Sequence, residues 1–276
     1  MSDTLELRVG CEFRYRAEHP TPSVFQVEPH GAGQHRVLRD AWELVPEAPS
    51  RAYRDLYDNV CRRMTIPAGE FSLRYDATVQ VPDAFDATAP EARELPAQDL
   101  PDDVLLYTLP SRYCLSDELA DDAWERFGAV APGYGRVQAI TDFVHGHVRF
   151  QYGSSTPSTT AVDVHRDGVG VCRDFAHLGI TYCRALNIPA RYVFGYLPDI
   201  AVEPLPDPMD FCAWAEAWLD GRWYTFDPRN NEPRKGRTVI GRGRDALDVA
   251  MVTTYGAPSL EAMTVWAEEA PAGVEA

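Results

Sequence analysis

The amino-acid sequence predicts an α+β protein in which a small all-β domain precedes a domain of helices packed on an antiparallel sheet. Three observations lead to this prediction. Residues 1–82 alternate apolar and polar side chains with the period of two that strands show. Residues 83–111 are rich in proline and acidic side chains, and residues 112–276 carry helical spacings first and strand patterns afterwards. Helices followed by antiparallel strands are typical of an α+β domain.

The N-terminal domain, 1–82, is expected to consist of strands joined by turns. The candidate strands are Leu5–Tyr15, Ser23–Val27, Val60–Ile66 and Phe71–Val81. The last two are separated by Pro67-Ala68-Gly69, which is a turn signal. Because no helical spacing interrupts these segments, a small sandwich or barrel-like sheet is predicted.

The second domain, 112–276, follows a linker, 83–111, that is expected to run extended over the surface. Apolar spacing and capping residues predict helices at Ser116–Phe127, Gly135–Val148 and Cys172–Leu186. Strand patterns cover 190–197, 211–219 and 222–226. Between the last two strands, Asp220-Gly221 is the residue pair that a two-residue type I′ hairpin turn favours.

The composition restricts the classes of partner. The formal net charge is −16, and because an acidic surface repels phosphate backbones, nucleic acid is not expected as a partner. No apolar run is long enough to cross a bilayer, and the N-terminus lacks the features of a signal peptide, so no membrane partner is expected. The six cysteines are scattered and form no CxxC pair, which favours reduced thiols in a cytoplasmic protein over a zinc ribbon or a disulfide framework.

Cys172 is the first candidate catalytic residue. It ends the stretch Gly168-Val169-Gly170-Val171-Cys172 and opens a predicted helix. The free N–H groups and the positive dipole end at a helix start favour a thiolate, which is the nucleophilic form of cysteine, and could also hold an oxyanion. The alternative is a buried helix cysteine that acts as a small apolar residue, and Cys183, in the middle of the same helix, fits that description better.

The predicted hairpin brings a second cysteine and an acid to one face. With Leu219 paired to Arg222, the alternation of side chains puts on that face Cys212, Trp214, Glu216, Trp218 and Asp227. Cys212 and Asp227 are then diagonal neighbours, about 7–8 Å apart at the backbone. A longer side chain at position 212 could reach Asp227 and be oriented by it. Asp227, which precedes a proline, could equally cap a turn.

Taken together, these segments resemble the bacterial transglutaminase-like superfamily, which has a papain-like core. The matching stretches are Gly170–His177, Leu186–Tyr196, Ala213–Glu216 and Phe226–Pro228, and the N-terminal β region resembles the domain that precedes this core in many members. The resemblance implies a Cys-His-Asp triad that attacks an amide and forms a thioester, which passes its acyl group to water or an amine. Cys172 matches the nucleophile and Asp227 the orienting acid. The resemblance implies a peptide or amide substrate and no cofactor.

The triad histidine is missing, because the family places it immediately before Ala-Trp, where this chain has Cys212. An imidazole exchanges protons near neutral pH, whereas a thiol with a pKa of about 8.5 does so poorly and holds its sulfur closer to the backbone. Among the other histidines, His165 in the approach loop is the expected substitute. His177 points elsewhere on its helix and is expected to be structural, and His145 and His147 are expected at the surface or as caps.

Other residues are assigned from the same patterns. Trp214, His165 and Asp174 are further candidate cleft residues, whereas Glu216 is expected to be a structural hydrogen-bonding partner. A solvated basic loop is expected from Arg234, Lys235, Arg237, Arg242 and Arg244. A metal site that combines Cys172, Cys212, Asp227 and a histidine is disfavoured, because no compact ligand spacing supports it.

Three interpretations of the site stay open. The first is an enzyme that uses Cys172 for acyl transfer or for hydrolysis of amides or peptides. The second is a binding or scaffold protein that keeps the fold without catalysis. The third is a thiol redox site formed by Cys172 and Cys212.

Overall fold

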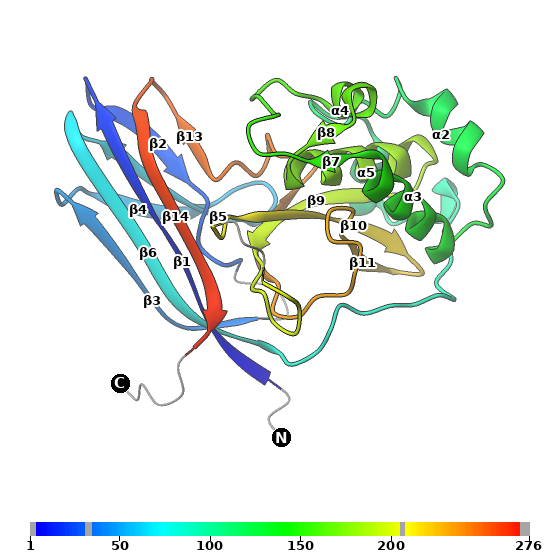
Figure 1. The fold of residues 1–276 in the computed structure, drawn as a ribbon, viewed down its shortest axis with the longest axis horizontal. Coiled ribbons are helices and arrows are strands. Elements are labelled where there is room, and N and C mark those ends of the chain that lie inside the picture. The colour runs from blue at the N-terminus through cyan, green and yellow to red at the C-terminus, as the bar shows by residue number, and fades with distance from the viewer. Residues whose placement is uncertain (1–3, 31–34, 205–207, 271–276) are drawn as a thin grey trace.

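The computed structural model describes residues 4–30, 35–204 and 208–270 of the chain, and it confirms the predicted α+β class. Figure 1 shows a β-rich part that contains both ends of the described chain and a second part in which helices gather on one side of a sheet. Among the described residues, no helix is both long and apolar enough to cross a membrane.

The N-terminal part is built from two antiparallel sheets of four strands each, with the orders β14-β1-β6-β3 and β13-β2-β5-β4. Their strands are β1 (Thr4–Ala17), β2 (Thr21–Phe25), β3 (Arg36–Val45), β4 (Ser50–Arg54), β5 (Val60–Ile66), β6 (Gly69–Pro82), β13 (Val252–Thr254) and β14 (Ser259–Glu269). Alternate side chains of β1 are buried, as the sequence pattern predicts. Phe13 of β1 meets Phe25 of β2 at a ring-centroid distance of 5.9 Å, which joins the two sheets through one core.

The C-terminal strands correct the predicted domain boundary. Strand β14 pairs with β1, and β13 pairs with β2, so residues 252–269 belong to the N-terminal sheets and not to the second domain. Gly10 lies opposite Trp266 in this pairing, and a side chain at Gly10 would come within 2.4 Å of the indole. The glycine therefore makes room for the returning strand. Local periodicity does not reveal such a return, because the pairing spans nearly the whole sequence.

The linker is not a free extended segment but is fastened to the second part of the chain. It contains short helical turns η1 (Ala97–Asp99), α1 (Asp102–Leu105) and η2 (Leu106–Thr108). The Glu94 carboxylate accepts hydrogen bonds from Gly133 N at 2.8 Å and from Arg136 Nη1 at 3.1 Å. The linker thus crosses the surface in fixed contact with the helices.

The second part is a four-stranded antiparallel sheet covered on one face by helices (Figure 1). Its elements are α2 (Ala120–Phe127), α3 (Tyr134–His147), β7 (Arg149–Phe150), α4 (Ala161–Asp167), β8 (Val169–Gly170), α5 (Cys172–Ala185), β9 (Ala190–Tyr196), β10 (Cys212–Leu219), β11 (Arg222–Phe226) and β12 (Thr238–Gly243). The hairpin register is confirmed, with Leu219 opposite Arg222 and Glu216 opposite Thr225. Helix α2 begins at Ala120 rather than near Ser116, and neither α4 nor β12 is predicted by the local patterns.

Glu216 joins three strands of this sheet through ion pairs, as its predicted structural role requires. Its carboxylate lies 2.5 Å from Arg191 Nη2 of β9 and 3.0 Å from Arg242 Nε of β12. All three side chains are largely buried, so removing the acid would leave two guanidinium groups without their partner.

We expect Glu216→Gln to lower the free energy of unfolding by about 3 kcal/mol, because breaking a buried ion pair from one side is strongly destabilising. The measurement is urea unfolding at neutral pH, followed by circular dichroism. Glu70→Gln is the matched control, since its pair with Arg16 is exposed and should contribute little to stability. Equal effects of the two changes would contradict the assignment.

Candidate active site

The start of helix α5 is shaped by Gly170 and Asp174. The Asp174 carboxylate accepts the Val171 N–H at 2.8 Å and also binds Ser155 and Arg173. A side chain at Gly170 would come within 2.8 Å of Asp174 Cβ, which explains the glycine two residues before Cys172. Because the Asp174 carboxylate is fully buried and occupied in these bonds, it positions the helix start and is not a cleft group.

The Cys172 thiol lies at the first residue of α5, opposite the start of β10. The residue is half-buried, and its Sγ donates to the Phe211 carbonyl at 3.8 Å. A side-chain hydrogen bond with Cys212 lowers the pKa of Cys172, and the positive charge of Arg229 acts in the same direction against the effect of burial. Cys172 is therefore the thiol of the pair that ionises first.

Cys212 is the first residue of β10 and lies in an apolar environment. It is 3% exposed and belongs to a small cluster with Val193, Leu197, Trp214 and Val239, against which Cys172 packs. Its hydrogen bond to Cys172 and its burial raise its pKa well above the ordinary value. Cys212 thus remains a neutral hydrogen-bond donor next to Cys172. Trp214 is 1% exposed and forms the floor of this cluster, not an open cleft wall.

Asp227 is buried and fully engaged with hydrogen-bond donors. Its carboxylate accepts from Arg229 N, Asn230 N and Asn230 Nδ2, and from Arg237 Nη2 at 2.9 Å. Burial alone would raise the pKa of Asp227, but Arg237 and Asn230 outweigh it, and the pKa is lowered. The acid matched to a triad aspartate therefore binds an arginine in this structure.

Arg237 is a site residue whose role the sequence patterns miss. Its guanidinium lies 4.7 Å from the ring centre of Trp214 and bridges the carboxylates of Asp227 and Asp86. Only 7% of the side chain is exposed, so the prediction of a solvated basic loop is wrong for Arg237, and it is wrong for the buried Arg234 as well. The only sequence signal for a buried Arg237 is the presence of acidic residues that could pair with it. Asp86 is distant in sequence, however, and only the fold brings it to Arg237.

A pocket of about 250 Å³ opens next to Cys212. It is lined by Tyr152, Leu197, Asp199, Pro208, Met209, Asp210, Cys212, Arg229, Asn230 and Arg234. Arg229 stacks on Phe150, with its Cζ 4.1 Å from the ring centre, which holds its charge at this pocket. Burial raises the pKa of Asp210 against a hydrogen bond from Phe211 N and the charge of Arg229. The pocket is thus lined by both apolar and charged side chains.

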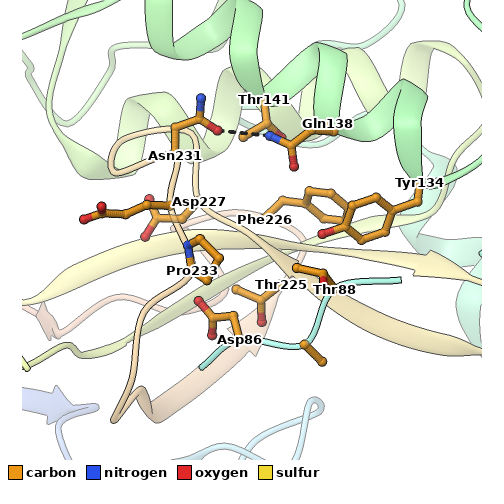
Figure 2. A pocket seen from close by; sticks show the side chains of 12 residues that line it. Asp86, Thr88, Tyr134, Gln138, Thr141, Thr225, Phe226, Asp227, Asn231 and Pro233 are labelled. Carbon is orange, nitrogen blue, oxygen red and sulfur yellow. Dashed lines mark hydrogen bonds between the residues drawn. The ribbon is translucent and has the colours of Figure 1, made fainter. Parts of the chain in front are cut away.

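A second pocket, of about 120 Å³, lies on another side of Asp227 and is shown in Figure 2. Tyr134, Gln138 and Thr141 of α3 point into it from one side, and Asp86 and Thr88 of the linker lie on the other. Neither sulfur atom lines it. Gln138 of α3 donates to Asn231 Oδ1 at 3.1 Å, so α3 and the 227–233 loop are joined beside this pocket (Figure 2). The pocket does not extend the cleft at the two cysteines.

The histidines occupy other places. His165, the expected substitute for the triad histidine, binds the Tyr182 hydroxyl through Nδ1 at 3.0 Å, and Tyr182 lies ten residues beyond Cys172 on α5. His177 is fully buried, accepts the Ala246 N–H through Nε2, and has a pKa lowered to about 3 by burial, which fits its predicted structural role. His145 and His147 both bind backbone carbonyls. The structure therefore brings together Cys172, Cys212 and Trp214 at the start of β10 without placing His165 among them.

Known proteins that resemble this chain in sequence or in structure include the following. The family model of the transglutaminase-like superfamily matches residues 124–228, which include Cys172, Cys212 and Asp227. The crystal structure of a candidate cysteine protease from Cytophaga hutchinsonii is similar, with a TM-score of 0.90 and 32% identity, covering 99% of this chain and 93% of that one. An uncharacterized protein of Mycobacterium leprae is 26% identical over 257 residues, 88% of this chain and 90% of that protein. One of Mycobacterium tuberculosis is 39% identical over 121 residues, 40% of this chain and 36% of that protein.

Alkylation of Cys172 by iodoacetamide should titrate with a midpoint below that of an ordinary thiol. In Cys212→Ala the midpoint should rise, because the interaction with Cys212 that contributes most to the lowered pKa of Cys172 is lost. Mass spectrometry of the peptide that contains Cys172, over a series of pH values, measures the rate. Cys183→Ala is the control, since this buried thiol lies elsewhere on α5. An unchanged midpoint in Cys212→Ala would show that the two thiols do not interact.

Proposed function

This chain belongs to the transglutaminase-like superfamily, and on that premise we propose that it is a cysteine-dependent enzyme of acyl transfer or amide hydrolysis, with Cys172 as nucleophile. The observation that supports the proposal most is the position of Cys172 at the start of α5, where Cys212 and Arg229 favour its thiolate. The proposed substrate is a peptide or another amide. Since every described cysteine is a free thiol, we also propose that the protein works in the reducing cytoplasm.

The first chemical step would form a thioester. The Cys172 thiolate attacks the acyl carbon, and the carbonyl oxygen becomes an oxyanion. The N–H groups of Asp174 and Phe175 donate to the Val171 carbonyl, which leaves the N–H groups of Cys172 and Arg173 as donors for that oxyanion. The leaving group then departs, and water or an amine releases the acyl group and restores the Cys172 thiolate.

Proton transfer is the step for which the site is least equipped. The triad histidine would protonate the departing amine, but the Cys212 thiol has a raised pKa and holds its proton. Arg237, which binds Asp227, does not deprotonate at physiological pH. Acyl groups with a leaving group that needs no proton should therefore react faster.

A binding or scaffold protein on the same fold is the second candidate function. The observation that favours it is the Asp227 carboxylate, whose acceptor positions are occupied by Arg237, Asn230 and the Arg229 N–H. In this alternative, Cys172 is reactive toward alkylating agents but turns over no acyl substrate. Turnover measurements on the variants below separate the two.

We expect the protein to turn over an activated ester of an N-acyl amino acid at least about 10²-fold faster than the anilide of the same acyl group, because only the anilide needs a general acid. Cys172→Ala should abolish both activities, whereas Cys183→Ala should leave them unchanged. Release of the chromogenic leaving group is the measurement. A folded wild-type protein with a reactive Cys172 but no turnover of either substrate would favour the binding function.

Cys212→His should raise anilide turnover by about 10- to 10²-fold by supplying the missing acid–base group. The gain is expected at the low end for such catalysis, because the Asp227 carboxylate that would orient the imidazole already binds Arg237. Cys212→Ala is the control, since it removes the thiol without adding a base. If the histidine variant folds, keeps a reactive Cys172 and still shows no gain, the cleft is not built for acyl transfer.

A further inference from the structure

We propose that Cys172 and Cys212 form a reversible oxidation site for hydroperoxides, in which Cys172 reacts with the peroxide and Cys212 resolves the product as a disulfide. The proposal does not depend on acyl transfer, although both would use the Cys172 thiolate.

The arrangement of the two thiols is the first support. Cys172 is the first residue of α5, and its Sγ lies 3.8 Å from the carbonyl oxygen of Phe211. Cys212, the first residue of β10, follows Phe211 directly in the chain. Both are free thiols. Cys172 also packs on the apolar cluster that contains Cys212, so the two residues meet without a rearrangement of secondary structure. The four other cysteines, Cys11, Cys61, Cys114 and Cys183, are buried.

The two thiols differ in the way that such a pair requires. Cys172 is half-buried and is the more acidic thiol, whereas Cys212 is 3% exposed and keeps its proton. A thiol that is both ionised and accessible reacts with peroxides, and a neighbouring thiol then resolves the sulfenic acid. Arg229, at the wall of the pocket beside Cys212, places a positive charge near both sulfur atoms.

The reaction balances as follows. The Cys172 thiol first releases its proton to solvent, and the thiolate attacks the outer peroxide oxygen. The O–O bond breaks, Cys172 becomes a sulfenic acid, and the alkoxide or hydroxide that leaves takes up a proton from solvent. The sulfur of Cys212 then attacks the Cys172 sulfur, the S–O bond breaks, and the hydroxide leaves as water with the proton that Cys212 releases. In sum, two thiols lose two electrons, the peroxide gains them, and an alcohol (or water) and one further water form. An external dithiol reverses the disulfide by exchange.

A cysteine in place of the histidine has a chemical use in this scheme. An imidazole at position 212 would leave the sulfenic acid of Cys172 open to further oxidation, to sulfinic acid, which is not reversed by thiols. A thiol at the same position captures the sulfenic acid and protects the sulfur. The disulfide also removes the nucleophile, so any chemistry of Cys172 would stop under oxidising conditions and resume after reduction.

The test uses the full-length protein, reduced, freed of reductant and treated with one equivalent of hydrogen peroxide. Peptide mass mapping without reduction should find most of the protein with a Cys172–Cys212 bridge, lighter by two hydrogens and reversed by dithiothreitol. Cys212→Ala should give no bridge and should instead accumulate Cys172 sulfenic acid, trapped by dimedone, and then sulfinic acid. Cys212→Ser, whose side chain is polar and of similar size, should give the same result as Cys212→Ala. Cys183→Ala should form the Cys172–Cys212 bridge as the wild type does.

The proposal is overturned if wild type and Cys212→Ala both carry Cys172 to the sulfinic acid at the same rate, or if Cys172 bridges to another cysteine. It is also overturned if Cys172 in the folded wild type does not react with peroxide. These results do not depend on acyl turnover, so a failure of the proposed function leaves the bridge measurement valid, and the reverse also holds.

Discussion

The position of the backbone at the start of β10 is the constraint on which the site depends. The Phe211 carbonyl oxygen accepts a hydrogen bond from the Cys172 thiol, and the residue that follows Phe211 is Cys212. The Phe211 ring packs on Phe194 and Tyr196 of the second part and on Phe13 of the N-terminal sheets. Just before it, the Met209 sulfur accepts the Ala267 N–H of β14. The returning C-terminal strand and the N-terminal sheet therefore help to hold one wall of the site, and the two parts of the chain act as one framework.

Local patterns predicted the elements whose geometry follows from nearby residues. The Asp220-Gly221 turn set the register that places Cys212 and Asp227 toward one end of the hairpin, and the helix start placed Cys172 at its first residue. What they could not predict is set by contacts that are distant in sequence. Arg237 pairs with Asp86 about 150 positions away, and β14 pairs with β1 across the whole chain. A run of basic residues looks the same in sequence whether its charges meet water or buried carboxylates.

The ion pairs around Asp227 show what replaces an aspartate–histidine contact here. Arg237 holds Asp227 and Asp86 at once and stacks on Trp214, so its charge is compensated although the side chain is buried. Each carboxylate has a charged partner, and the pKa of Asp227 is lowered, so Asp227 stays ionised. An arginine remains charged at any physiological pH, whereas a histidine changes its charge near neutrality. The network therefore stabilises the loop after β11 but contributes no proton transfer.

The neutral thiol of Cys212 favours the Cys172 thiolate in a different way from an imidazole at the same position. In a cysteine–histidine pair, the thiolate is favoured because the imidazole takes the proton and becomes a cation, so nucleophile and acid arise together. Cys212 instead favours the Cys172 thiolate by donating a hydrogen bond while it keeps its own proton. The site thereby provides a nucleophile, the Cys172 thiolate, without providing an acid that would protonate the leaving group. A thiolate of this kind can attack an electrophile whose leaving group departs without a proton, and an activated acyl carbon meets that condition better than an amide does.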